Sequence, residues 1–275
     1  MTTIREVRAR LRSDALAAGI NPRDVDILLA DVLGRSFTSI LARDEKELSS
    51  DAATALDDAV ARRRRGEPLQ YIRGRCDFYG RGFVVDPRVL IPRPETELLV
   101  EHALMRATAN ARVLDVATGS GCIAVTIALE RTDVTVFGCD ISYDALAVAN
   151  KNADSLEADV SFFAGDLLEP VRDSRWDLIV SNPPYVSRKE ASTMQTEVVR
   201  HEPHGALFAE DDGMAIIRSL LAQSRALLRF EGFLLMEIGF GQLPAVSHAA
   251  NELGWSVEAF NDLAAIPRVV VLSRR

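Results

Sequence analysis

The sequence predicts an α/β protein in which a small, all-helical N-terminal domain precedes a doubly wound parallel sheet. Two patterns along the 275 residues support this prediction. Apolar residues recur at helical spacing through the first 65 residues, and beyond Glu95 short apolar strands alternate with helix-length segments. Because 48% of the residues are hydrophobic and 26% are charged, the chain can bury a globular core, which excludes collagen-like and disordered classes.

Three helices are expected in the N-terminal domain, residues 1–65. Apolar side chains recur three and four residues apart from Ile4, a second stripe follows Asn21-Pro22, and a third follows Ser49-Ser50. The third predicted helix ends in four arginines, residues 62–65, where the helix dipole favours positive charge. An exposed helix end accounts for this run, and contact with an acidic partner is the alternative.

Residues 66–94 are interpreted as a connector that contains a β-hairpin. Eight Gly and Pro residues interrupt this segment, and Phe83-Val-Val85 has the composition of a strand between turns. We expect the boundary between the helical domain and the sheet domain, residues 95–275, to fall inside the connector.

Polar residues follow four predicted strands of the sheet domain, which are residues 112–116, 134–139, 160–163 and 176–180. Ligands of doubly wound sheets bind at the carboxyl ends of the strands, so these residues mark a candidate site. The turn after the first strand ends in Gly119-Ser-Gly121, where missing side chains allow a ligand to approach a helix start. Asp140 follows 19 residues after Gly121, a spacing typical of carboxylates that bind a ribose hydroxyl.

Three carboxylates, Asp115, Asp140 and Asp166, are expected at these strand ends. Carboxylates that share a crevice need a cation or hydroxyl donors as partners. A sulfonium cofactor that carries a ribose and an adenine amino group supplies both.

The fourth strand ends in the most specific pattern of the chain, Ser181-Asn-Pro-Pro-Tyr185. Each proline lacks an N–H donor and has a fixed φ, which can leave backbone carbonyls as acceptors. The side-chain oxygen of Asn182 adds another acceptor. Two rigid acceptors fit a planar –NH₂ group, with one hydrogen bond from each N–H, while the Tyr185 ring can lie over the group.

The charge of the chain is divided unevenly. Residues 1–75 hold 14 Lys and Arg against 12 Asp and Glu, whereas residues 76–275 hold 18 against 28, a net charge of −10. Nucleic-acid binding depends on Lys and Arg contacts to phosphate, so we expect no direct contact with nucleic acid. The four histidines lack metal-ligand spacing, and no metal is expected.

Neither export nor membrane insertion is expected. No apolar run reaches the ~20 residues that span a bilayer, and the first residues lack the pattern of a secretory signal. Three cysteines without a Cys-x-x-Cys pair fit a reducing compartment, and Cys122 and Cys139 are expected to be buried core residues. We therefore expect a cytoplasmic protein, and a monomer.

The motifs resemble those of class I S-adenosylmethionine-dependent methyltransferases that act on planar amino or amide nitrogens. Within that class the chain closely resembles the bacterial release factor glutamine methyltransferase family. The resemblance spans roughly residues 66–275, whereas the first 65 residues agree in type only. The segments that carry it are Pro68–Ile72, Val89–Glu97, Thr118–Gly121, Asn182–Tyr185, Glu202-Pro203, Ala206-Leu207, Asp212-Gly213 and Glu237–Gly239.

This resemblance implies a Rossmann-like, seven-stranded methyltransferase sheet and methylation of the glutamine side-chain amide in the Gly-Gly-Gln loop of peptide chain release factors. It implies that S-adenosyl-L-methionine is the cofactor and that the helical domain docks the release factor. The cofactor-binding residues carried over by position are Ala117, Thr118, Gly119, Ser120, Gly121, Asp140, Asp166, Leu167 and Asn182, with Leu167 beside the adenine. The substrate-binding residues are Asn182, Pro183, Pro184 and Tyr185, of which Asn182, Pro183 and Tyr185 are the catalytic candidates.

Two alanines depart from the family pattern, because Ala117 and Ala265 stand where glycine is usual. If the turn at Ala117 needs a left-handed backbone, alanine costs ~1–2 kcal/mol there. Glu95 and Glu97 follow Pro94 at a helix start, where carboxylates favour the dipole; a place in the site is equally open.

Three other functions are weighed against this one. A sister family that methylates a ribosomal-protein glutamine resembles Pro-Arg-Ser-Pro where this chain has Pro92-Arg-Pro-Glu95. An adenine amino-group methyltransferase acting on nucleic acid would present the same –NH₂ group but would need a basic surface. A catalytically silent cofactor-binding or docking module would not need Asn182 and Tyr185.

Overall fold

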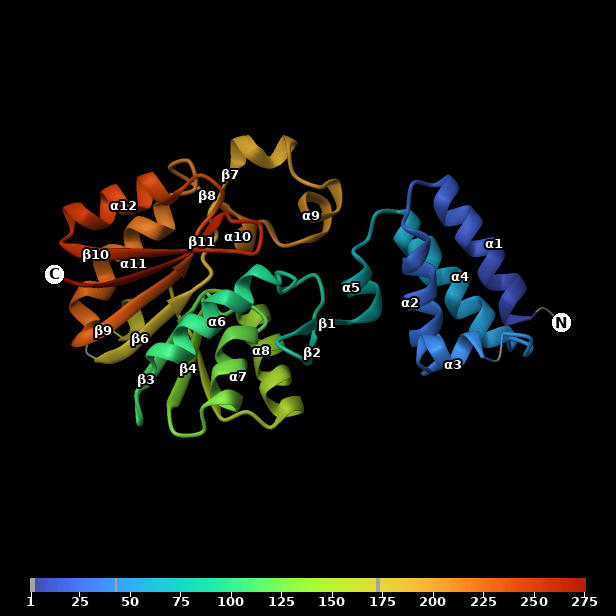
Figure 1. Ribbon diagram of the computed structural model, residues 1–275, viewed down its shortest axis with the longest axis horizontal. Helices are drawn as coiled ribbons and strands as arrows, with labels where there is room; N and C mark the ends of the chain where they lie inside the picture. Colours follow the sequence, from blue (N-terminus) through green and yellow to red (C-terminus); the bar gives the residue numbers. More distant parts are fainter. Residues whose placement is uncertain (1–2, 43, 172–173) are drawn as a thin grey trace. The chain divides into compact units, whose positions relative to one another are not determined.

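The computed structural model describes residues 3–42, 44–171 and 174–275 and divides into two compact units (Figure 1). The helical unit comprises the described residues up to Gly74 together with Thr196–His201, and the sheet unit comprises Arg75–Gln195 and Glu202–Arg275. The division after Gly74 lies inside the segment that the sequence marks as a connector. The three-part subdivision at residues 65 and 94 stays a prediction.

The helical unit contains the three predicted helices and three shorter ones. Side chains of Thr3, Asn21 and Ser49 cap the N-termini of the three long helices. The apolar stripes of these helices pack together in one shared core. The short helices have only five or six residues, too few for a periodic pattern. The helices are α1 (Ile4–Ala17), α2 (Pro22–Leu33), α3 (Phe37–Leu41), α4 (Ser50–Arg64), α5 (Leu69–Arg73) and α9 (Thr196–His201).

The arginine run at the end of α4 serves partly inside the helical unit. Arg63 donates hydrogen bonds to Asp24 at 2.8 Å and to Glu197 of α9 at 2.6 Å. Arg64 and Arg65 are exposed, as expected for a helix end. Part of the run therefore stabilises the unit itself by pairing with its own carboxylates.

The sheet unit is built on a seven-stranded sheet in the order β10-β11-β9-β6-β3-β4-β5. The strands from β9 to β5 in this order are parallel, and β11 and β10 continue the sheet in antiparallel fashion. This arrangement confirms the predicted Rossmann-like, doubly wound α/β sheet. The strands are β3 (Arg112–Val116), β4 (Thr135–Asp140), β5 (Val160–Ala164), β6 (Trp176–Ser181), β9 (Leu228–Glu237), β10 (Trp255–Asn261) and β11 (Pro267–Arg274).

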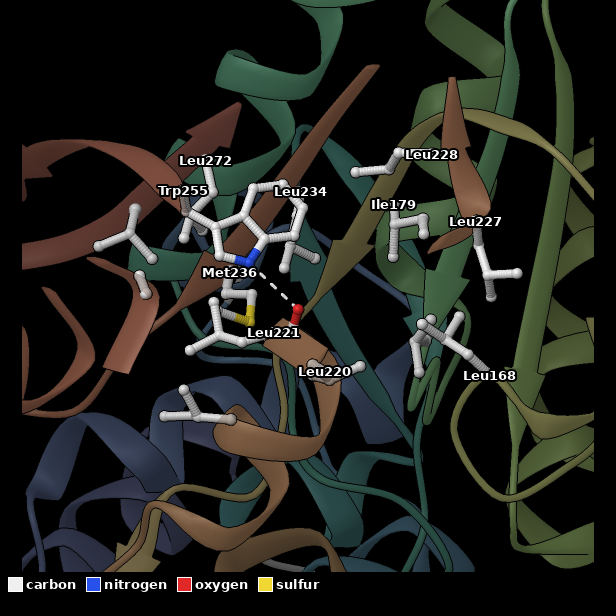
Figure 2. Packing of buried hydrophobic residues seen from close by; sticks show 14 of the residues in the cluster. Leu168, Ile179, Leu220, Leu221, Leu227, Leu228, Leu234, Met236, Trp255 and Leu272 are labelled. Carbon is white, nitrogen blue, oxygen red and sulfur yellow. Dashed lines mark hydrogen bonds between the residues drawn. The ribbon is translucent and has the colours of Figure 1, made fainter. Parts of the chain in front are cut away.

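Helices cover both faces of this sheet with separate apolar cores. One core contains side chains of α11 (Ala215–Leu227) and α12 (Leu243–Glu252). Figure 2 shows Trp255 in this core, with Nε1 donating to the Leu221 carbonyl, at 3.1 Å. The other core contains side chains of α6 (Glu95–Arg106), α7 (Cys122–Glu130) and α8 (Tyr143–Leu156). The strand interiors are apolar on both faces because both are covered.

The predicted hairpin is formed by β1 (Arg75–Phe78) and β2 (Arg81–Val84). The side chain of Asn152 on α8 accepts from Val84 N at 2.7 Å and donates to the Val84 carbonyl at 3.0 Å and the Ser120 carbonyl at 2.9 Å. One buried amide therefore joins the hairpin, helix α8 and the turn that follows β3.

The segment after β6 contains short elements that the sequence does not predict. Strand β7 (Val186–Ser187) pairs with β8 (Phe208–Ala209), and α10 (His204–Leu207) and the 3₁₀ turn Arg188–Ser192 lie between them in the chain. A second 3₁₀ turn covers Glu169–Val171. Among the described helices, none has the length and apolar character needed to cross a membrane.

We expect Gly138→Ala to lower the free energy of unfolding by about 1–3 kcal/mol, because a Cβ there would lie 2.6 Å from the Phe162 ring of the neighbouring strand. Urea unfolding measures the effect. Gly82→Ala is the matched control: its φ is also not positive, and the nearest atom, Asp77 Oδ1, would lie at 3.9 Å. The control should stay within about 0.5 kcal/mol of the parent. Equal stability of the two variants would contradict this account of the packing under β4.

Candidate functional site

A cavity of about 490 Å³ opens at the carboxyl ends of β3, β4, β5 and β6. This is the edge at which the sequence analysis expects a ligand. Cavities of this size suit small organic ligands. The predicted site residues that line it are Ala117, Thr118, Gly119, Ser120, Asp140, Asp166, Leu167, Asn182 and Pro184.

Three predicted site residues do not line this cavity. Gly121 is the N-cap residue of α7 with φ +78°, and a Cβ there would lie 3.0 Å from the Ala149 Cβ, so its missing side chain serves packing. Pro183 is buried. The Tyr185 hydroxyl donates to Glu237 Oε1 at 3.0 Å. The functional roles assigned to these three residues stay predictions.

The turn after β3 has a left-handed backbone at several positions. Ala117 has φ +58° and Gly119 has φ +55°. The amide of Thr118 donates to the Cys139 carbonyl at 3.0 Å, which holds the turn against β4. Ala117 therefore has the left-handed backbone in which alanine is costly, and the turn keeps this form despite the Cβ. Ala265, the other departure, has φ +61°.

Asp140 lies at the rim of the cavity in a fixed orientation. Its Oδ2 accepts from Gly119 N at 2.9 Å and its Oδ1 from Ser142 N at 2.9 Å. These two bonds link the end of β4 to the turn after β3 and to the start of α8. A carboxylate held in this way can accept hydroxyl donors from a ligand with its remaining lone pairs.

Asp115 does not belong to the cavity, and the expectation of three carboxylates in one crevice is wrong for this residue. Its side chain is fully buried behind the turn, where Oδ2 accepts from Thr118 Oγ1 at 2.5 Å and from Ala124 N at 3.2 Å. Burial raises the pKa of Asp115 to about 7. Its role is to hold the turn, whereas Asp140 and Asp166 face the ligand space.

A chain of hydrogen bonds runs from Asn182 into the protein. Asn182 Nδ2 donates to Thr96 Oγ1 at 3.1 Å, and Thr96 Oγ1 donates to Glu237 Oε2 at 2.6 Å. Because Tyr185 donates to the other oxygen of Glu237, both carboxylate oxygens are engaged. Burial raises the pKa of Glu237 and that of Tyr185.

Sequence reasoning gave no site role to Thr96 and Glu237. Glu237 carried a detectable signal, since a single acidic residue ends the apolar run Phe233–Met236 of a buried strand. Arg93 was also missed: it lines the cavity and donates to Glu202 Oε1 at 2.5 Å, while Ile91 N donates to Oε2 of the same carboxylate at 3.2 Å.

Glu95 and Glu97 lie in the first turn of α6 and outside the lining of the cavity. Glu97 Oε1 accepts from Tyr79 N at 2.7 Å, which ties the hairpin to α6. Glu95 is exposed, and neither glutamate lines the cavity.

Cys122 and Cys139 are buried as expected, and burial raises the pKa of each thiol to about 12. Both therefore remain thiols near neutral pH.

The chain belongs among the methyltransferases, as a family model and similar sequences show. Residues 94–210 match the methyltransferase small domain family, and residues 3–74 match the PrmC N-terminal domain family. A solved methyltransferase from Pyrococcus furiosus shares the fold with a TM-score of 0.56 at 15% identity, covering 78% of this chain and 98% of that one. Catalysis by this class depends on S-adenosylmethionine.

Closer relatives define the family. A release factor glutamine methyltransferase from Koribacter versatilis is 45% identical over 256 residues, which cover 91% of each chain. One from Escherichia coli is 39% identical over 260 residues, covering 93% of this chain and 94% of its own. The chain belongs to the family of release factor glutamine methyltransferases, as the motif resemblance indicates.

We expect Asp115→Asn to remove a pH dependence of stability. The native pKa is raised, so the native state holds a proton that the unfolded chain releases, and the free energy of unfolding falls as pH rises towards 7. From pH 6 to 8 the asparagine variant should gain about 1.4 kcal/mol relative to the parent. Urea unfolding at both pH values measures the difference. A constant difference between parent and variant would show that Asp115 does not titrate in this range.

We expect Ala117→Gly to raise the free energy of unfolding by about 0.5–1 kcal/mol. Glycine relieves a left-handed penalty of ~1–2 kcal/mol but adds entropy to the unfolded chain. Ala265→Gly, at a similar φ outside the cavity, should give a gain of the same sign. Because the turn already has its left-handed form, cofactor affinity should change less than about twofold, which calorimetry measures. A loss of stability only in the first variant would contradict this interpretation.

Proposed function

We propose that this chain transfers a methyl group from S-adenosyl-L-methionine to the side-chain amide nitrogen of the glutamine in the Gly-Gly-Gln loop of peptide chain release factors. The observation that carries the proposal is the orientation of Asn182, whose Nδ2 is held by Thr96 at the edge of the cavity. This orientation leaves Oδ1 as the acceptor for an incoming N–H group.

The cavity has the chemistry that this cofactor needs. Asp140 and Asp166 provide acceptors for hydroxyl and amino donors, and Ile141 and Leu167 provide apolar contacts for a flat ring. The backbone of Gly119 lies at the cavity without a side chain, and a Cβ there would meet no atom within 4 Å. We assign the cofactor to residues 117–120, Asp140, Asp166 and Leu167.

The sulfonium group of S-adenosylmethionine supplies a methyl group that is already activated for transfer. The protein therefore mainly has to position the nitrogen, a task that can contribute several kcal/mol. An amide nitrogen is a weak nucleophile because its lone pair is delocalised into the carbonyl. Acceptors at Asn182 Oδ1 and the Pro183 carbonyl would bind both N–H groups and direct the lone pair at the methyl group.

The helical unit is proposed to dock the release factor. Its match to a domain family covers residues 3–74, and it has its own apolar core. This arrangement separates recognition of a large protein from the chemistry at its glutamine. We further propose that the enzyme acts as a monomer in the cytoplasm, where release factors function, and that it needs no direct contact with nucleic acid.

The function is tested by incubating the protein with labelled S-adenosylmethionine and one substrate at a time. The substrates are a release factor, its Gln→Ala loop variant, ribosomal proteins and DNA. We expect label on the release factor and none on its Gln→Ala variant. Label on ribosomal proteins or DNA alone would overturn the proposal in favour of the sister family or an adenine methyltransferase.

Asn182→Ala is the variant that links this activity to the site. Losing one preorganised acceptor should slow methylation by about 30- to 1,000-fold, a barrier increase of ~2–4 kcal/mol. Because Asn182 is itself a predicted cofactor-binding residue, circular dichroism serves as the control for folding, and calorimetry measures cofactor binding separately. Parental turnover in a variant that still binds the cofactor would contradict the proposed role of Asn182.

A further inference from the structure

We propose that Glu237 and Thr96 are positioning residues that fix the direction of the Asn182 amide, so that the site selects an –NH₂ group over a carboxylate. This inference rests on the proposed function, because it concerns how the same site distinguishes glutamine from glutamate. It assigns a task to two residues that lie in segments of the family resemblance but have no predicted site role.

The direction of the hydrogen bonds follows from the chemistry of the groups. The Thr96 hydroxyl donates to Glu237 Oε2 and the Tyr185 hydroxyl donates to Glu237 Oε1, so both oxygens of Glu237 accept. With its single proton used, Thr96 Oγ1 can only accept from Asn182. The amide must therefore present Nδ2 to Thr96, which turns Oδ1 to another side.

The direction of the Asn182 amide is maintained because Thr96 and Glu237 are buried and because Glu237 has a second hydrogen-bond partner. Thr96 is 2% exposed and Glu237 is 1% exposed, so water is excluded from both groups of the inner hydrogen bond. Tyr185 engages the second oxygen of Glu237, which leaves the carboxylate little freedom to rotate. Thr96 lies in the first turn of α6 and Glu237 at the end of β9, so two regular elements hold the network.

The consequence is selectivity rather than affinity alone. If Asn182 turned over, it would present N–H groups to the substrate, repel a glutamine amide hydrogen and attract a carboxylate. Sites built for a particular hydrogen-bond donor reject analogues that lack it, because their own polar groups are left unpaired. Removing the Thr96 hydroxyl should therefore lower methylation and also weaken the preference for glutamine over glutamate.

The test compares Thr96→Val, which replaces the hydroxyl with a methyl group, and Thr96→Ser, which keeps the hydroxyl. We measure kcat and KM on the release factor, cofactor binding, and competition by a release factor with a Gly-Gly-Glu loop. In Thr96→Val, kcat should fall about 10²-fold with cofactor binding unchanged, and the Gly-Gly-Glu competitor should bind about tenfold better relative to substrate. Thr96→Ser should stay within about threefold of the parent in every measurement.

Glu237→Gln provides an independent test of the same network. A glutamine side chain can donate as well as accept, so the hydrogen bonds through Thr96 can run in either direction. We expect this variant to bind the cofactor and to lose part of the discrimination against the Gly-Gly-Glu competitor. If Thr96→Val does not fold, as judged by circular dichroism, Thr96→Ala removes the same hydroxyl without adding volume.

The outcomes separate this inference from the proposed function. If the parent protein does not methylate the release factor glutamine, the proposed function fails whatever the variants do. If the parent is active and Thr96→Val keeps its turnover and its selectivity, only the positioning role is overturned. A loss of activity that Thr96→Ser shares, with selectivity unchanged, would likewise overturn it in favour of a packing role.

Discussion

The site depends on the burial of one carboxylate, that of Glu237. A buried carboxylate without partners costs several kcal/mol, so the structure has to bring donors to it. The donors are the hydroxyls of Thr96 and Tyr185, one at the start of α6 and the other in the segment after β6. The two hydrogen bonds to Glu237 thus connect the start of α6, the end of β9 and the segment after β6.

A second buried carboxylate, that of Asp115, holds the turn after β3, which lines the cavity. Asp115 accepts from Thr118 within the turn and from the backbone of Ala124 in α7. Asp115 therefore holds the turn from its buried side, and Asp140 holds it at the cavity by accepting from Gly119 N. In both halves of the site, the carboxylates buried behind the cavity determine how the groups lining it are oriented.

The sequence predicts those parts of the fold whose stability is local or uniformly apolar. The strands at 112–116 and 176–180 lie within one residue of their predicted limits because both faces of the sheet are buried. The short pair β7 and β8 depends on tertiary contacts and has no pattern of its own. The bond between Thr96 and Glu237 joins residues 141 positions apart, a separation that no spacing rule covers.

In the proposed role, the orientation of Asn182 selects a chemical group but not the molecule that carries it. The –NH₂ group of adenine would offer the same two hydrogens as a glutamine amide, so the acceptors at the cavity discriminate against carboxylates and not against a nucleobase. That second choice has to be made outside the cavity. A net charge of −10 over residues 76–275 disfavours a phosphate backbone, and the proposed function assigns docking of the protein substrate to the helical unit. In the proposed function, selectivity therefore combines hydrogen-bond direction at the reacting atom with charge and with docking by the helical unit.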